Sequence, residues 1–494
     1  MWRRKTVRDR FGSLAFGAAL WLACCTAANT ADGEDWPCFL GPNHNGVSAE
    51  TGLIDTFPDE GPNVLWEKTL GTGYAAPSVR GQRIVFHHRL RNQEIVECCH
   101  AVTGESLWKR ATPSQYRDPY GYNNGPRCTP VLTETLCYSL GAEGRLLCLR
   151  LADGAVVWEH ELAKEFEIPA GFFGVGCSPL LYAADGKAIR SALAAEGDLL
   201  IVLVGGQPQA GVVAFDAKSG TIRWKNVGKS TWNGVPQGRA GKPYEWTGEE
   251  MVVSYSSPVA AEIAGHHHLL CLMRQGLVSL DPQTGDENFH YWFRPLVHES
   301  VNAATPVVVD NTVLLSAAYR LGSVLLRIAD DGKSCTEIWS SPKNLLTHWS
   351  TAIPLQGHYL GFSGRHEEEG ELRCVSGKDG SVIWSTIGCA AEKVKDYRIN
   401  ESGEVVDTTT SKTVPHPLYG RGSAILADDK VFILTERGTL AVMKADPTGW
   451  HELARCKGHK MRYPSWTAPV LCQGRMYLRC EESLVCLDVQ GGKK

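Results

Sequence analysis

Several signals that would assign a chain to a familiar class of enzyme are missing from these 494 residues. The sequence contains no G-x-S-x-G elbow, no H-E-x-x-H pair, no phosphate-binding loop and no C-x-x-C-H haem site. The local motifs of α/β-hydrolases, zinc proteases, P-loop enzymes and c-type cytochromes are therefore absent.

Beyond residues 1–31 the chain has no basic run, and no segment is long and apolar enough to be expected to span a membrane. The formal net charge is −4, and without residues 1–31 the chain keeps 45 basic and 53 acidic residues, a net −8. Such a surface argues against nucleic acid or an anionic membrane as a partner. The strongly apolar stretch "FGSLAFGAALWLACCTAA" is too short to cross a bilayer as a helix.

Residues 1–31 have the order of a secretory signal peptide, because a basic start is followed by an apolar centre and then by small residues. We therefore expect an exported protein of the periplasm or cell envelope, whose mature chain has no transmembrane helix. The letters "LACC" (Leu22 to Cys25) resemble a lipoprotein cleavage box, so a lipid anchor stays open as an alternative.

Cysteine is frequent, but its placement does not predict a disulfide framework. Fifteen of the 17 cysteines lie beyond the signal, and most of them fall on strand-like patterns. Cysteine is a common small buried residue, and disulfide frameworks are typical of much smaller domains. We interpret these residues mainly as core thiols, and isolated bridges stay open.

A repeated phrase dominates the rest of the chain. Its fullest copy is "VVAFDAKSGTIRWKN", an alternating apolar strand, a Ser219-Gly220 turn and a short strand that ends at Trp224. A second apolar strand and a proline-led first strand precede each copy. Four short strands that recur every 40 to 70 residues are typical of propeller blades. Further copies carry their tryptophan at Trp108, Trp158, Trp292, Trp339 and Trp384, and the leading prolines are Pro77, Pro130, Pro179, Pro258, Pro306, Pro354 and Pro469, with Ala424 in the remaining unit.

The last copy, "LVCLDVQGGKK", stops before its tryptophan, and the missing strand is found in "NVLWEKTLG" around Trp66. An N-terminal strand that completes the last blade covers an edge that would otherwise be exposed. We predict an all-β, eight-bladed β-propeller with four-stranded antiparallel blades, closed by this N-terminal strand. A stack of two β-sandwiches is the alternative. The expected domains are a signal peptide (1–31), an N-terminal extension (32–62), the propeller (63–489) and a tail (490–494).

These units resemble the PQQ-type propeller repeat, whose core reads "A-L-D-A-x-T-G-x-x-x-W". The opening "WPCFLGPNHNGVS" (Trp36 to Ser48) is similar to the "WPxFRGPxxxGxS" start of many exported bacterial proteins with this repeat. The resemblance covers Trp36 to Val489 and implies the fold. It does not fix the function, because the superfamily holds quinoprotein dehydrogenases as well as BamB, a non-catalytic lipoprotein of outer-membrane assembly.

Loops that lead into the first strands gather at one mouth of a propeller channel, so we place the candidate site there. Aromatic rings with a few amide, arginine and histidine side chains in one cavity are suited to binding a ligand or partner. The alternative is that the rings plug the channel and the polar groups satisfy loop backbone. The candidate binding residues are Tyr74, Tyr122, Asn123, Asn124, Arg127, Phe173, Asn302, His348, Trp349, Tyr419, Arg421 and Trp466.

The resemblance also raises the question of a cofactor. Enzymes of the family hold PQQ between a tryptophan and a vicinal disulfide, with Ca²⁺ bound by Glu, Asn and Asp. The repeat alignment places the vicinal pair Cys98-Cys99 inside a third strand, where neighbouring side chains face opposite surfaces. The triplet His266-His267-His268 is expected at an exposed hairpin turn and lacks a third ligand. We therefore expect no catalytic residue, no metal and no cofactor, with PQQ and calcium as the alternative.

The sequence thus favours a non-catalytic binding or scaffold protein of the cell envelope, similar to BamB, whose partner is an envelope protein or polymer. A PQQ-dependent dehydrogenase of alcohols or polymeric alcohols is the first alternative. A carbohydrate-binding propeller, with sugars stacked on Trp349, Trp466 and Tyr419, is the second.

Overall fold

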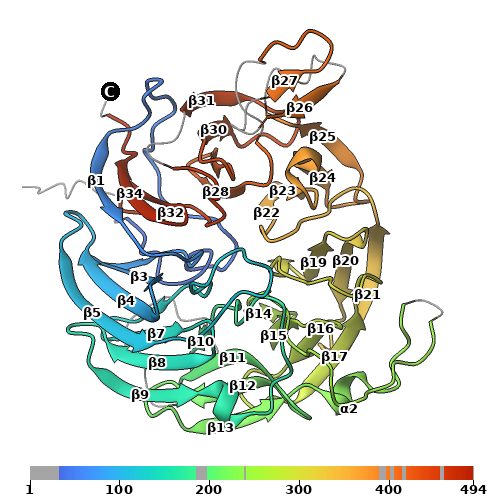
Figure 1. The fold of residues 1–494 in the computed structure, drawn as a ribbon. Coiled ribbons are helices and arrows are strands. Elements are labelled where there is room, and N and C mark those ends of the chain that lie inside the picture. Colours follow the sequence, from blue (N-terminus) through green and yellow to red (C-terminus); the bar gives the residue numbers. More distant parts are fainter. Residues whose placement is uncertain are drawn as a thin grey trace, which may run out of the picture. The chain divides into compact units, whose positions relative to one another are not determined.

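The computed structural model describes residues 33–184, 197–238, 241–388, 396–400, 405–413, 419–456 and 461–492. The predicted signal peptide at residues 1–31 lies outside these residues. Within the unit Gly33–Lys494, the described residues form eight four-stranded antiparallel sheets that follow one another around a ring (Figure 1). This confirms the predicted eight-bladed β-propeller.

Each blade begins with a short inner strand and ends with an outer strand. The first four blades are β2 (Ser78–Arg80), β3 (Arg83–Leu90), β4 (Gln93–His100) and β5 (Ser106–Pro113); β6 (Val131–Leu132), β7 (Leu136–Leu140), β8 (Arg145–Arg150) and β9 (Val156–Glu161); β10 (Leu180–Tyr182), β11 (Leu199–Gly206), β12 (Ala210–Asp216) and β13 (Ile222–Asn226); and β14 (Val259–Ile263), β15 (His266–Leu272), β16 (Gly276–Leu280) and β17 (Glu287–Trp292).

The other four blades follow the same order. They are β18 (Val307–Val309), β19 (Thr312–Ala317), β20 (Gly322–Ile328) and β21 (Cys335–Ser341); β22 (Ile353–Leu355), β23 (His358–Ser363), β24 (Glu371–Ser376) and β25 (Val382–Thr386); β28 (Ser423–Ala427), β29 (Lys430–Leu434), β30 (Leu440–Lys444) and β31 (Glu452–Cys456); and β32 (Val470–Cys472), β33 (Arg475–Arg479), β34 (Ser483–Asp488) and β1 (Val64–Thr69). Outside the blades lie the hairpin β26 (Tyr397–Ile399) and β27 (Val405–Asp407), the helices α1 (Leu162–Glu165) and α2 (Lys229–Trp232), and a 3₁₀ turn at Glu367–Glu369.

The ring closes where the sequence predicts it. Strand β1 pairs with β34 of blade eight, with Trp66 opposite Cys486, and Figure 1 shows the blue strand beside the red one. The Lys68 ammonium of β1 lies 3.0 Å from the carboxylate of Glu97 on β4 in blade one. The N-terminal strand therefore completes blade eight through a strand ladder, and an ion pair links this strand to blade one.

The tryptophan and glycine of the repeated phrase meet between blades. The ring of Trp158 in blade two lies against Gly220 of blade three, and its Nε1 donates to the Ala217 carbonyl at 3.1 Å. Gly220 has φ +76°, and a Cβ at this position would lie 2.7 Å from the Trp158 ring, so glycine is required on both counts. The indoles of Trp66, Trp108, Trp224, Trp339 and Trp384 donate in the same way to carbonyls of the next blade.

Blade four departs from the predicted pattern. In this blade Phe289 takes the strand position that the tryptophan occupies in most other blades. Phe289 pairs with Ser279 just before the β-bulge, as Trp224 pairs with Ala214 just before the bulge in blade three. The predicted blade tryptophan, Trp292, lies three residues farther on. Its ring instead contacts Trp232 of α2, in the connection between blades three and four, with the ring centroids 6.1 Å apart.

Two smaller expectations also change, and the interpretation of the cysteines as core thiols is confirmed. In blade six the position equivalent to the leading prolines is Ala352, because β22 begins at Ile353 and Pro354 pairs inside the sheet. His266 opens strand β15 and does not form the turn, which leaves His268 fully buried with its Nδ1 2.8 Å from the Ser279 hydroxyl. The described cysteines are all free thiols, and all except Cys335 are buried. None of the helices among the described residues is long and apolar enough to span a membrane.

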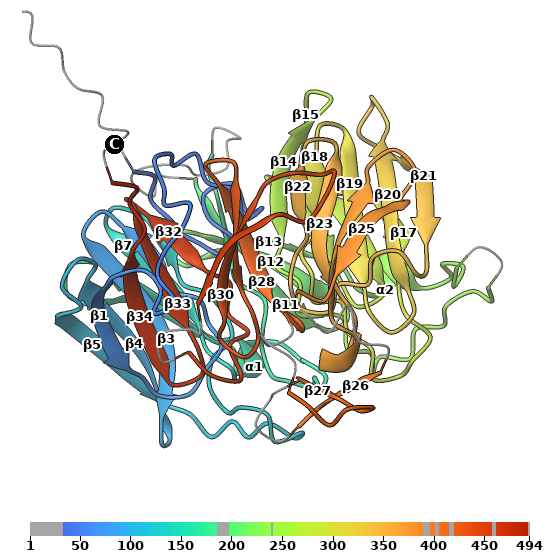
Figure 2. The same ribbon diagram turned by 90° about the horizontal axis from the view of Figure 1, so that it is seen from above.

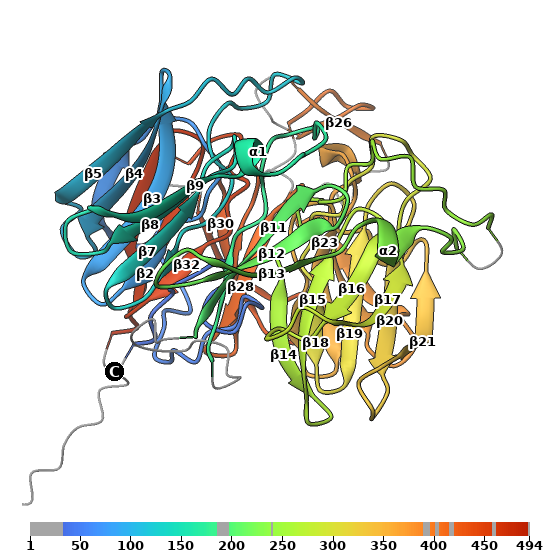
Figure 3. The same cartoon turned by 90° about the horizontal axis from the view of Figure 1, so that it is seen from below.

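The N-terminal extension lies along one end of the ring. Figures 2 and 3 show its blue loops at the end opposite to α1 and the β26–β27 hairpin. The loops that lead into the first strands lie at the α1 end, so the extension and the predicted mouth are at opposite ends of the channel.

Candidate functional site

A cavity of about 350 Å³ occupies the centre of the ring, and loops from the blades line it. Two sets of equivalent positions in the loops shape this cavity. The first set is the third residue before each leading proline, and the second set is the residue directly before that proline. In blades six and seven, Ala352 and Ala424 take the place of the proline. We call the first set the upper ring: Tyr74, Arg127, Gly176, Tyr255, Ala303, Trp349, Arg421 and Trp466, all of which line the cavity. We call the second set the lower ring: Ala76, Thr129, Ser178, Ser257, Thr305, Thr351, Ser423 and Ala468.

The lower ring consists of small side chains, and this leaves room for the cavity. Its hydroxyls also link neighbouring blades, since Ser178 Oγ accepts the Thr129 N–H at 2.9 Å and Ser257 Oγ accepts the Ser178 N–H at 3.0 Å. Six of the eight upper-ring side chains are large aromatic or basic groups, and neighbouring loop residues such as Tyr122, Phe173 and His348 add to them. The eightfold repeat thus produces one central cavity with a bulky, chemically varied rim.

Eight of the twelve residues predicted for the mouth line this cavity. They come from six of the blades and from loops that lie far apart in the sequence. These eight residues are Tyr74, Tyr122, Arg127, Phe173, His348, Trp349, Arg421 and Trp466.

The other four predicted residues lie outside the cavity and satisfy loop structure. Asn123 accepts the Gly125 N–H at 2.6 Å, and Asn124 Oδ1 accepts the Asp118 N–H at 2.7 Å. Asn302 is buried, and its amide donates to two backbone carbonyls at 3.0 and 2.9 Å. Tyr419 is fully buried and hydrogen-bonds Glu452, so it forms no sugar-stacking surface with Trp349 and Trp466.

Arginines of the upper ring are held against aromatic rings and buried carboxylates. Arg127 Nη2 lies 2.6 Å from the Asp118 carboxylate, and its guanidinium carbon is 5.8 Å from the Tyr74 ring centroid. Arg421 is paired at 2.8 Å with buried Glu436, which also accepts the Trp466 indole N–H at 3.2 Å. Each carboxylate offsets the desolvation of its arginine and fixes the orientation of the guanidinium.

A polar corner lies on the side of blades five and six. His348 Nε2 is 3.1 Å from the Tyr319 hydroxyl, and the Arg365 guanidinium sits 4.5 Å above the Tyr319 ring. Burial, with Arg421 and Arg365 nearby, lowers the pKa of His348 to about 3, so the imidazole is neutral near pH 7. Tyr319 and Arg365 lie in turns between the second and third strands of their blades.

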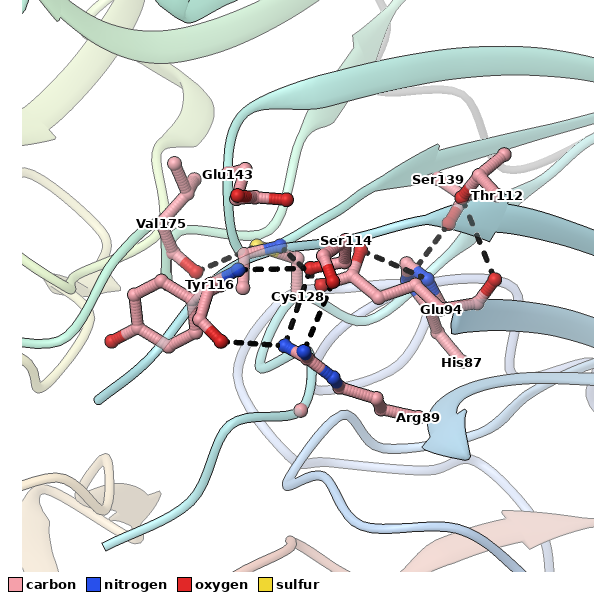
Figure 4. A network of polar contacts seen from close by, with 12 residues as sticks. His87, Arg89, Glu94, Thr112, Ser114, Tyr116, Cys128, Ser139, Glu143 and Val175 are labelled. Carbon is pink, nitrogen blue, oxygen red and sulfur yellow. Dashed lines mark hydrogen bonds and ion pairs between the residues drawn. The ribbon is translucent and has the colours of Figure 1, made fainter. Parts of the chain in front are cut away.

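The loop that carries Tyr122 and Arg127 is held from behind by a buried arginine. Arg89, at the end of β3, donates to the carbonyls of Tyr116 and Asn124, each at 2.9 Å, and to the Ser114 hydroxyl at 3.2 Å. Figure 4 shows this side chain pointing into the turn at Ser114 and Tyr116. The wall of the cavity on this side therefore depends on a residue that does not line it.

Sequence reasoning missed several lining residues. Tyr255 belongs to the upper ring, and its spacing of three residues before Pro258 would have identified it. Tyr120 lies in the same loop as Tyr122. Tyr319 comes from a hairpin turn whose sequence did not indicate a binding site. Phe39 comes from the N-terminal extension, whose position relative to the channel could not be read from the sequence.

The residues at the cavity do not fit a calcium-bound quinone. Calcium needs several converging oxygen ligands, and Glu299 is the one carboxylate among the described lining residues. Nowhere in the described part of the chain do three His, Cys, Asp or Glu side chains gather as a metal site would require. Cys98 and Cys99 lie buried in β4, the third strand of blade one, as the repeat alignment predicts.

Comparison with known proteins supports the fold and narrows the family. A family model described as outer membrane protein assembly factor BamB matches residues 47–170, 92–386 and 211–493. The structure is similar to BamB from Moraxella catarrhalis, with a TM-score of 0.52 and 12% identity over 87% of this chain and 99% of that one. It is also similar to quinohemoprotein alcohol dehydrogenase from Comamonas testosteroni, with a TM-score of 0.57 and 14% identity over 93% of this chain and 81% of that one. No curated protein sequence matches the chain.

Proposed function

The chain belongs to the PQQ-repeat β-propeller family of the outer membrane protein assembly factor BamB, and from this premise we propose that it is a non-catalytic binding or scaffold protein of the cell envelope. It binds its partner at the channel mouth, through the cavity and the loops around it. The observation that carries this proposal is the convergence of loops from every blade on one cavity.

The rim of the mouth supports a docking role. Leu296, in the loop between blades four and five, is 101% exposed, and Tyr122 and Tyr120 are 56% and 51% exposed. Tyr463 stands on the same face, with its ring 5.9 Å from that of Trp466. Large apolar side chains exposed around a cavity are typical of a surface that a partner covers.

Site-specific cross-linking tests this proposal. A photoreactive p-benzoyl-phenylalanine at Leu296 or Tyr122 should capture the same discrete envelope component, because both positions stand at the mouth. The matched control is Leu107 on outer strand β5, which is 45% exposed but lies away from the mouth. Filling the cavity with Ala303→Trp should weaken capture from the mouth positions. The proposal would be contradicted if the same component were captured equally at all three positions, or if Ala303→Trp left the capture from Leu296 and Tyr122 unchanged.

A quinoprotein dehydrogenase is the competing candidate, and the size of the cavity favours it. About 350 Å³ lies in the range of cofactor and ligand sites. The shortage of carboxylates at the cavity weighs against it. Titration with PQQ and calcium separates the two candidates, because only the dehydrogenase requires both to bind.

A further inference from the structure

The N-terminal extension is fastened to the ends of inner strands on both sides of the channel. Trp36 donates to the Val79 carbonyl in blade one at 3.0 Å, and Leu132 in blade two donates to the carbonyl of Pro37 at 2.8 Å. Farther along the extension, Ser48 donates to the carbonyl of Leu426 in blade seven at 2.9 Å. The segment between Pro37 and Ser48 therefore passes from blades one and two to blade seven.

Two side chains of this segment reach the cavity. Phe39 and Leu40 line it, although every other lining residue comes from a blade or from a loop between strands. Leu40 adopts φ +60°, a left-handed conformation that costs a leucine about 1–2 kcal/mol relative to glycine. The strain is retained in a segment that is closed by its own hydrogen bonds, such as Gly46 N–H to the Leu40 carbonyl at 2.9 Å.

The lower ring does not close the channel, because its eight side chains are Ala, Ser or Thr. The extension supplies the bulk that is missing there. Trp36 anchors it, fully buried and in contact with Gly41, where a Cβ would lie 3.0 Å from the indole. The far end of the cavity is thus occupied by a rigid, apolar part of the chain that is not itself a blade.

We propose that Phe39 and Leu40 form the floor of a blind cavity, which a ligand enters and leaves only past the upper ring. The site therefore takes a compact molecule or the end of a chain, and not a polymer that passes through the ring. The choice of ligand rests on the proposed binding function, whereas the blind geometry does not.

Labelling of a thiol inside the cavity tests the geometry without any ligand. Ala468→Cys places a reporter in the lower ring, and N-ethylmaleimide is small enough to reach it. Most native thiols are buried, and burial raises the pKa of Cys98, for example, to about 12, which slows their reaction. Peptide mass spectrometry then follows the reporter alone. Ala303→Trp narrows the mouth, and Phe39→Ala with Leu40→Gly removes the floor.

In the chain with its native floor, Ala303→Trp should slow labelling of the reporter at least tenfold. In the floorless chain it should change the rate less than twofold, because the reagent then enters from the other end. Val47→Ala is the matched control, since Val47 anchors the extension beside Leu426 but does not line the cavity. Circular dichroism verifies folding, and Leu40→Gly alone replaces the double variant if the latter fails to fold. Rapid labelling despite Ala303→Trp, or equal slowing with and without the floor, would overturn the proposal.

Discussion

Replacing Glu94 with glutamine should stabilise the protein at pH 8 and leave its stability at pH 5 nearly unchanged. The Glu94 carboxyl is buried on β4, where it accepts the Ala142 N–H at 3.1 Å and lies 3.6 Å from His87 Nε2. Burial, reinforced by nearby Glu143, raises its pKa from 4.5 to about 7. Figure 4 shows how Glu94, His87 and Arg89 lie behind the mouth loop.

The sign follows from proton binding. Between pH 4.5 and 7 the folded protein holds a proton on Glu94 that the unfolded chain releases, so the free energy of unfolding falls as the pH rises through this window. The difference between a pKa of 4.5 and one of about 7 corresponds to ~3 kcal/mol of stability, which is lost once the pH has risen past 7. Glutamine keeps an oxygen acceptor for the Ala142 N–H and carries no charge, so it removes this loss.

Urea unfolding of both proteins at pH 5 and pH 8 measures the effect. The difference in unfolding free energy, Glu94→Gln minus parent, should be ~3 kcal/mol more favourable at pH 8 than at pH 5. The matched control is Glu134→Gln, because Glu134 is a half-exposed glutamate 3.8 Å from Arg80. A Glu94→Gln difference that is the same at both pH values would refute the reasoning.

Three further substitutions test the contacts between blades, each by urea unfolding. Glu97→Gln should cost ~3 kcal/mol, because it removes the charge of a buried carboxylate that pairs with Lys68 of blade eight at 3.0 Å and with His88 and Lys109 of blade one at 3.4 and 3.3 Å; a loss under 0.5 kcal/mol would show that these ion pairs contribute little to the ring closure. Gly220→Ala should cost ~2 kcal/mol or more, since it adds a clash with Trp158 to the strain of φ +76°; Gly81→Ala, with φ +54° and nothing within 4 Å, should show the strain alone. Phe289→Ala should cost ~3 kcal/mol, because Phe289 packs in blade four where most other blades place their tryptophan; a loss as small as that of an exposed side chain would show that Trp292 makes this contact instead.

The fold could be predicted because the letters of the repeat encode contacts between blades. A glycine such as Gly220 and a tryptophan such as Trp158 recur together since each needs the other across the blade interface. The same contact explains why the last copy of the repeat lacks its tryptophan. At the ring closure Trp66 of the N-terminal strand makes this contact instead. Trp292 was misassigned because periodicity does not reveal where a bulge shifts the pairing by a few residues.

The site was only partly predictable, because spacing places residues along a strand but does not say how a loop folds back. Arg127, Trp349, Arg421 and Trp466 share a fixed distance from the first strand, and they do line the cavity. Asn302 lies in such a loop too, but buried backbone carbonyls use its amide donors. Tyr319 and Phe39 reach the cavity from a hairpin turn and from the extension, which the repeat does not position.

The most direct test of the central claim is a titration of the purified mature protein with PQQ and Ca²⁺, followed by visible absorbance and melting temperature. A non-catalytic binding propeller predicts no saturable spectral change and no rise in melting temperature, while cross-links from Leu296 and Tyr122 persist. A saturable spectral change together with a stabilised fold and oxidation of an alcohol would contradict that claim and establish a quinoprotein dehydrogenase.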